Sequence, residues 1–186
     1  YIMQDDQTYP LTNEPNRIPN PLALNLYTLG YDSNKKLTTL NTATKTNLST
    51  YLEQYRMLTD AVNIKDAFII NFQIDFVITT YKTYNNERVL LQCITELKNY
   101  FSIDNWQLNQ PIILSEVRNL IGGITGVQTV ENLVLKNISG EELGYSQYRY
   151  GFENATRNDV IYPSMDISIF ELKFPNKDIK GRVTTY

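Results

Sequence analysis

Histidine is absent from the 186 residues, and cysteine occurs once, as Cys93. Without histidine the chain has no Ser-His-Asp triad and no Cys-His nucleophile pair, and it lacks the commonest ligand of zinc and iron. A single cysteine excludes an internal disulfide and fits a reducing compartment. We therefore expect no catalytic, cofactor-binding or metal-binding residues, and no enzyme activity.

A strong charge of either sign is missing as well. Lys and Arg together number 17 against 20 Asp and Glu, which gives a formal net charge of −3. Such a chain has no basic field that would attract nucleic acid or an anionic membrane. The N-terminal segment lacks the apolar core of a signal peptide, and no apolar run is long enough to span a bilayer. We therefore expect no nucleic-acid, membrane or small-molecule partner.

Proline is concentrated at the start of the chain. Residues 1–21 contain four of the seven prolines and little periodicity, which predicts an extended N-terminal arm. The remaining residues, 22–186, have the composition of one globular domain. This domain includes a polar, tyrosine-rich excursion at about 138–163.

The clearest pattern in the sequence is the stretch AFIINFQIDFVITTY, residues 67–81. Phenylalanine and isoleucine alternate there with mostly polar positions, among them Asn71, Gln73 and Asp75. Strict alternation predicts a long strand with one face against helices and the other facing water or a partner. The three polar residues are therefore candidates for an interface.

Apolar residues spaced three and four apart predict helices on either side of this strand. The first helix is expected over residues 42–58 and the second over 87–101, with Asn86 as its N-cap. A short third helix is expected over 114–123, with Ser115 as its cap. The apolar stripes of the two longer helices consist of Leu48, Tyr51, Leu52, Tyr55 and Leu58, and of Leu90, Ile94, Leu97 and Phe101.

Strands are expected before the first helix, after the third, and over residues 164–174, where a shift in alternation near Ile169 and Phe170 suggests a bulge. The order is β-α-β-α-α-β-β. It predicts an α+β sandwich whose sheet is covered on one face by two longer helices and one short helix.

Three glycines in the stretch NLIGGITGVQTVENLVL, residues 119–135, raise the question of a phosphate loop. Such a loop follows a strand and opens a helix, so that the free N–H groups face the anion. Here a helix ends at the glycines and a strand follows. We therefore interpret Gly122 as a helix stop, since glycine favours left-handed C-caps.

The segment YSQYRYGF is the best candidate for molecular interaction. It combines Tyr145, Tyr148, Tyr150 and Phe152 with Arg149, a composition suited to stacking on sugars or on a protein surface. It predicts either a carbohydrate-binding adhesion module or a protein interface. The other interpretation is a loop that packs its rings against its own domain.

Carboxylates are scattered along the chain, and a third hypothesis is an enzyme that uses two of them, such as a cell-wall glycosidase. That chemistry requires two carboxylates facing each other across a cleft. The sequence does not indicate such a pair, and surface carboxylates are the rule.

Four stretches, taken in order, carry a family resemblance: LNLYTLGYDSNKKLTTLN, LEQYRMLTDAVNIKDAFIINFQIDF, VLLQCITELKNYF and QPIILSEVRNLIGGITGVQTVENL. They resemble the C-terminal part of the baseplate wedge protein of T-even-type contractile-tailed bacteriophages, within the baseplate J-like family. The likeness covers most of residues 22–136 and continues through DISIFELKFPNKDIKGRV. It is weakest over 138–163.

The resemblance implies a structural role without catalytic residues. Members of this family form dimers and link baseplate wedges into a ring around the central hub of the tail. The chain would then be the C-terminal part of a larger subunit of the virion, assembled in the host cytoplasm. Its expected partners are a second copy of itself, as a homodimer, and other baseplate wedge proteins.

Overall fold

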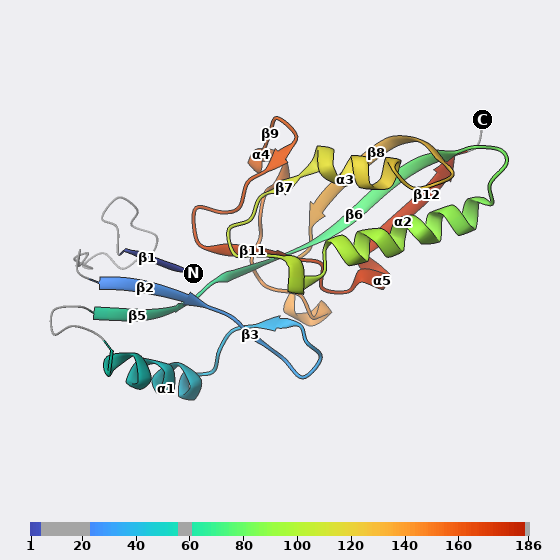
Figure 1. Ribbon diagram of the computed structural model, residues 1–186. Coiled ribbons are helices and arrows are strands. Elements are labelled where there is room, and N and C mark those ends of the chain that lie inside the picture. Colours follow the sequence, from blue (N-terminus) through green and yellow to red (C-terminus); the bar gives the residue numbers. More distant parts are fainter. Residues whose placement is uncertain (5–22, 56–60, 185–186) are drawn as a thin grey trace. The chain divides into compact units, whose positions relative to one another are not determined.

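The computed structural model describes residues 1–4, 23–55 and 61–184, and it confirms the α+β class (Figure 1). The chain divides into two compact units, Tyr1–Phe68 and Ile69–Tyr186. The sequence had instead predicted an arm followed by a single domain from residue 22. Residues 5–21 of that arm lie outside the described residues.

The first unit contains a three-stranded sheet of order β1-β2-β5. Its strands are β1 (Ile2–Gln4), β2 (Ala23–Thr28) and β5 (Ala61–Asp66), and its helix is α1 (Thr42–Glu53). β2 and β5 are parallel, and parallel neighbours need a crossover connection, which includes α1. A short hairpin of β3 (Gly30–Tyr31) and β4 (Leu37–Thr38) lies between β2 and α1 in the chain.

Helix α1 begins as the sequence predicts, but it is shorter and less buried. The Asn41 side chain caps it by accepting a 2.7 Å hydrogen bond from the backbone N–H of Thr44. The helix ends at Glu53 instead of residue 58, and it contributes no buried residue. The predicted apolar stripe is therefore shorter than expected and only partly buried.

Two tyrosines of that stripe remain outside the core. Tyr51 is 56% exposed and Tyr55 is 70% exposed, and their ring centroids lie 5.1 Å apart. An ion pair of 2.6 Å between Lys45 and Asp66 joins the helix to β5. Leu58 lies outside the described residues.

The second unit is built around one long strand, β6 (Phe68–Thr80). Strand β8 (Val127–Asn137) pairs with it antiparallel and β12 (Ile179–Thr184) pairs with it parallel. Because both pair with the same stretch of β6, they lie on its two opposite sides. β11 (Ser168–Glu171) completes this four-stranded sheet.

Two helices cover one face of this sheet: α2 (Asn86–Tyr100) packs on β12, and α3 (Leu114–Gly122) packs on β8 (Figure 1). The N-cap of α2 is Asn85, not Asn86, and its side chain accepts a 3.1 Å hydrogen bond from the N–H of Arg88. Ser115 does not cap α3, which follows Ile113 without a side-chain cap.

No helix of the described residues is long and apolar enough to cross a membrane.

The predicted alternation of β6 is confirmed. Five side chains point toward the helices, and each is at most 1% exposed: Ile70, Phe72, Ile74, Phe76 and Ile78. Phe72 meets Phe101 at the end of α2 edge to face, with 5.2 Å between ring centroids. Phe68, at the first position of the strand, is 40% exposed.

The glycines between α3 and β8 form a turn. α3 ends at Gly122 and β8 begins at Val127, so the helix presents its carbonyl end there, which does not attract phosphate. Gly126 has a φ of +104°, and a Cβ at this position would lie 2.7 Å from Val89 Cγ2. Backbone conformation and close packing therefore both require glycine at residue 126.

The C-terminal part differs from the sequence prediction. β11 is shorter than the predicted strand, and all four of its residues are buried. Burial on both sides of the strand therefore accounts for the lost alternation. β12 was not predicted.

The remaining elements are short. They are β7 (Ile112–Ile113), β9 (Thr156–Arg157) and β10 (Val160–Ile161), which form a small sheet, the helices α4 (Phe152–Ala155) and α5 (Pro175–Asp178), and 3-10 turns at Ile103–Asn105 and Glu141–Leu143.

Candidate interaction surface

The second face of the four-stranded sheet points away from α2 and α3. We call part of it the open face. It consists of Gln73, Asp75, Val77 and Thr79 of β6, Glu131, Val134 and Lys136 of β8, and Lys180, Arg182 and Thr184 of β12. Successive side chains of a strand point to opposite faces, so most of these residues alternate with core residues. Glu131 is the exception, because it lies at a shift in the pairing register between β6 and β8. Three strands thus supply one polar surface.

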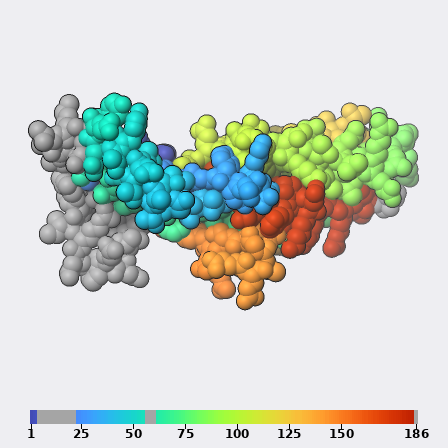
Figure 2. Space-filling model, turned by 90° about the horizontal axis from the view of Figure 1, so that it is seen from below, coloured from blue at the N-terminus to red at the C-terminus, as the bar shows by residue number. Residues whose placement is uncertain are grey.

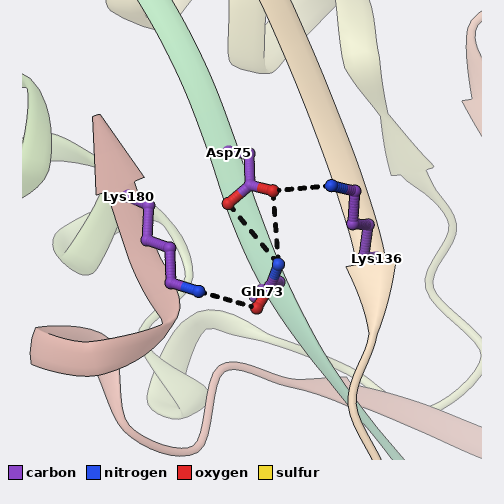
Figure 3. A network of polar contacts seen from close by, with 4 residues as sticks. All are labelled: Gln73, Asp75, Lys136 and Lys180. Carbon is purple, nitrogen blue, oxygen red and sulfur yellow. Dashed lines mark hydrogen bonds and ion pairs between the residues drawn. The ribbon is translucent and has the colours of Figure 1, made fainter. Parts of the chain in front are cut away.

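A polar network crosses the open face from β8 to β12 (Figure 3). Lys136 Nζ lies 2.9 Å from Asp75 Oδ2. The side-chain amide of Gln73 donates to the same carboxylate at 3.2 Å. The side-chain oxygen of Gln73 accepts a 3.4 Å hydrogen bond from Lys180. The network therefore brings together two of the three polar residues that the sequence singled out in β6.

A second link crosses the same three strands further along. Glu131 of β8 accepts hydrogen bonds from the hydroxyl groups of Thr79 and Thr184, the latter at 3.3 Å. Thr79 is buried, whereas Glu131 and Thr184 are exposed. The carboxylate thus spans β6 and both of its neighbours.

The apolar part of the open face lies between the two links. Val77 and Val134 are both half-buried, and Val134 lies opposite Asp75 in the strand register. Exposed ion pairs such as Asp75–Lys136 contribute about 0–1 kcal/mol to stability, so the network orders these side chains more than it stabilises the fold. The result is a small apolar centre flanked by charges of both signs.

Asn71 was predicted to belong to this surface, but it is fully buried. Its amide donates a 2.9 Å hydrogen bond to Glu171, and its side-chain oxygen accepts one of 2.7 Å from the N–H of Ser146. The tyrosine-rich segment thus covers the end of the sheet at Asn71. The alternation of β6 gives Asn71 the correct face, but it cannot indicate that another segment covers this end.

The rings of the tyrosine-rich segment pack largely against the domain. Tyr145 is 4% exposed and Phe152 is 5% exposed. Phe152 contacts Phe170 with 5.7 Å between ring centroids. The hydroxyl of Tyr145 donates a 2.6 Å hydrogen bond to Asp178. Burial, followed by this hydrogen bond and the nearby carboxylate charge, raises the pKa of Tyr145 well above its usual range. Tyr145 and Phe152 therefore belong to the core, and neither ring is available to stack on a sugar.

The middle of the segment is less buried. Arg149 is exposed, and Tyr148 and Tyr150 are half-buried. The Tyr150 hydroxyl donates a 2.6 Å hydrogen bond to the carbonyl of Tyr162. Burial, together with the neighbouring Tyr148, raises the pKa of Tyr150. These three residues stay predicted interface residues.

Two surface hollows of about 560 and 510 Å³ lie beside α2. The first has Glu87 as its one carboxylate, and the second has Glu96. Neither therefore brings together the two carboxylates that a glycosidase needs.

Within residues 1–4, 23–55 and 61–184, no group of three His, Cys, Asp or Glu side chains is placed to hold a metal ion. Cys93 is buried, and burial raises the pKa of its thiol to about 11, so the thiol is protonated at neutral pH and does not have the character of a reactive thiolate.

Comparison with known proteins adds no family assignment. No model of a protein family matches the chain, and no curated protein matches it.

Proposed function

We propose that the chain is a structural component of a contractile-tail baseplate wedge, which self-associates and helps to link wedges into a ring. The proposal combines the ordered family motifs of the sequence with the surface of the second unit. Its localisation would be the virion, in the tail baseplate, and its partners would be a second copy and other wedge proteins.

The open face is the observation that carries the proposal. It has an apolar centre at Val77 and Val134 and charged groups of both signs around it, including Asp75, Lys136 and Arg182. Specific interfaces commonly combine an apolar centre with a polar rim. A surface that holds both signs of charge can also be complementary to itself, as a two-fold interface requires.

The polar network favours this use because its side chains are already held in place. Gln73 and Lys136 converge on the Asp75 carboxylate at 3.2 and 2.9 Å. Ordering long side chains before association lowers the entropy that binding must overcome. A second copy that meets this face therefore loses less side-chain freedom than it would on a disordered surface.

Sedimentation velocity over a range of concentrations tests the proposal. We expect the chain to form a reversible dimer at high micromolar concentration, and to form complexes when it is mixed with other baseplate wedge proteins. A chain that stays monomeric and forms no complex with these proteins would contradict the proposal.

A further inference from the structure

β12 is an edge strand of the four-stranded sheet. It pairs with β6 from Ile179 to Thr184, and no other strand of the described residues pairs with it. Its outward-facing N–H and C=O groups form an unpaired row, which is a template for another extended segment. Figure 2 shows the red C-terminal segment uncovered at the surface beside the yellow-green of α2.

The exposed charges of β12 are all positive. Lys180 and Arg182 are exposed on the open face, and the strand sequence IKGRVT contains no carboxylate. Lys180 reaches Gln73 at 3.4 Å. No side chain of the described residues forms an ion pair or hydrogen bond with Arg182. A strand added along this edge would therefore meet two cations at alternate positions.

The other side of β12 faces α2 and is apolar. A Cβ on Gly181 would lie 2.5 Å from both Leu90 Cδ1 and a Phe76 ring carbon, so the helix packs closely here. The Lys98 side chain of α2 donates a hydrogen bond to the side chain of Asn176 in α5, the short helix directly before β12. The side of α2 that carries Lys98 therefore faces β12. Leu91, two helical turns before Lys98, lies on the same flank and is 62% exposed. Apolar side chains of an added strand would cover Leu91.

Pairing between two copies of β12 is disfavoured by charge. In an antiparallel pair the same faces align, so Lys180 and Arg182 of one copy would lie opposite or diagonal to the same cations of the other. Like charges at directly opposed positions destabilise a sheet. The occupant is therefore a different chain.

We propose that the outer edge of β12 binds an extended segment of another protein in which carboxylates alternate with apolar residues. Its carboxylates would face Lys180 and Arg182, and its apolar side chains would pack toward Leu91 and α2. The inference rests on the proposed assembly role and names the chemistry of one partner. It concerns the backbone edge of β12, whose cations Lys180 and Arg182 also belong to the open face.

A fluorescent peptide of alternating glutamate and valine tests this inference on the full chain. We expect fluorescence anisotropy to show binding that is at least about tenfold tighter than that of a lysine–valine peptide, and weaker at high salt. Hydrogen exchange should show new protection of the β12 amides. The double variant Lys180→Glu/Arg182→Glu should reverse the peptide preference, whereas the matched control Lys82→Glu/Arg157→Glu, at two exposed positions away from β12, should retain it.

Three results would overturn the inference. One is the absence of peptide binding to a folded chain. Another is equal binding of the acidic peptide by the double variant, and the third is binding without protection of β12, because both indicate that the peptide binds at another site. Sedimentation of the chain alone measures self-association and involves no peptide, so failure of the proposed function is distinguishable from failure at β12.

Discussion

The side-chain amide of Asn71 lies 2.9 Å from the carboxylate of Glu171, which comes 100 residues later in the chain, and both residues are buried. Asn71 also receives a hydrogen bond from the N–H of Ser146. One amide thus joins the central strand to β11 and to the tyrosine-rich segment. Alternation alone predicts that Asn71 lies on an interface, whereas in the structure its buried side chain forms hydrogen bonds within the domain.

Replacing Asn71 by alanine should destabilise the second unit by about 2–3 kcal/mol, because the buried Glu171 carboxylate and the half-buried Ser146 N–H each lose one hydrogen bond. Urea denaturation followed by circular dichroism measures this change. Gln147→Ala, at an exposed position of the same segment, is the control and should change stability by less than about 0.5 kcal/mol. Equal effects of the two variants would contradict the assigned role of Asn71.

The contact between Gly181 and α2 predicts a steric effect. Gly181→Ala places a methyl group 2.5 Å from Leu90 and Phe76, and overpacking of this kind costs about 1–3 kcal/mol. Gly122→Ala is the matched control, because no atom lies within 4 Å of a Cβ there. Thermal unfolding should therefore show a lower Tm for the first variant and an unchanged or higher Tm for the second.

The buried hydroxyl of Tyr145 predicts a dependence of stability on pH. Because its pKa is raised in the folded state, the folded chain holds this proton more tightly than the unfolded chain. Stability is therefore fully present below the ordinary pKa of about 10 and is lost as pH rises above it. Tyr100, whose pKa burial and Glu116 raise to about 12, adds a loss of the same sign between pH 10 and 12.

Tyr145→Phe separates the two tyrosines. The variant should be less stable than the wild type at pH 8, because Asp178 loses one hydrogen-bond donor, and the difference should shrink as pH rises above about 10. Chemical denaturation at several pH values measures both quantities. A difference that stays constant up to pH 11 would show that the Tyr145 hydroxyl does not titrate as inferred.

The sequence predicted the parts of the fold that rest on local periodicity. Alternation located β6 and its core face, and the spacing of Leu90 and Leu97 located α2. The order of helix, glycines and strand identified the turn between α3 and β8, but the left-handed C-cap expected there is not formed, because Gly122 ends the helix and its C-cap Gly123 is right-handed. These features depend on neighbouring residues, which is why a single sequence is sufficient to reveal them.

The missed features depend on distant segments. β12 carries a glycine and two cations in six residues, and it becomes a strand by pairing with β6, more than 100 residues earlier in the chain. All four residues of β11 are buried, so no alternation is left in its sequence. No sequence pattern around Lys136 or Lys180 predicted that they belong to the polar network, because strand pairing alone brings them to Gln73 and Asp75.

The open-face network should contribute little to stability. Asp75→Ala removes the 2.9 Å ion pair with Lys136, but this pair is accessible to water, so we expect a change of less than about 1 kcal/mol in the free energy of unfolding. Urea denaturation at low and high salt measures this change. A loss of several kcal/mol would show that the network is a structural element and not a surface held ready for a partner.

The measurement that tests the proposed assembly role most directly is sedimentation velocity of the wild type beside Asp75→Lys. This variant places a third cation next to Lys136 and Lys180, so two open faces would repel each other, while the fold is retained. We expect a reversible, concentration-dependent dimer for the wild type and a folded monomer for the variant. A wild type that is monomeric at high micromolar concentration, or a variant that dimerises equally well, would contradict self-association through the open face.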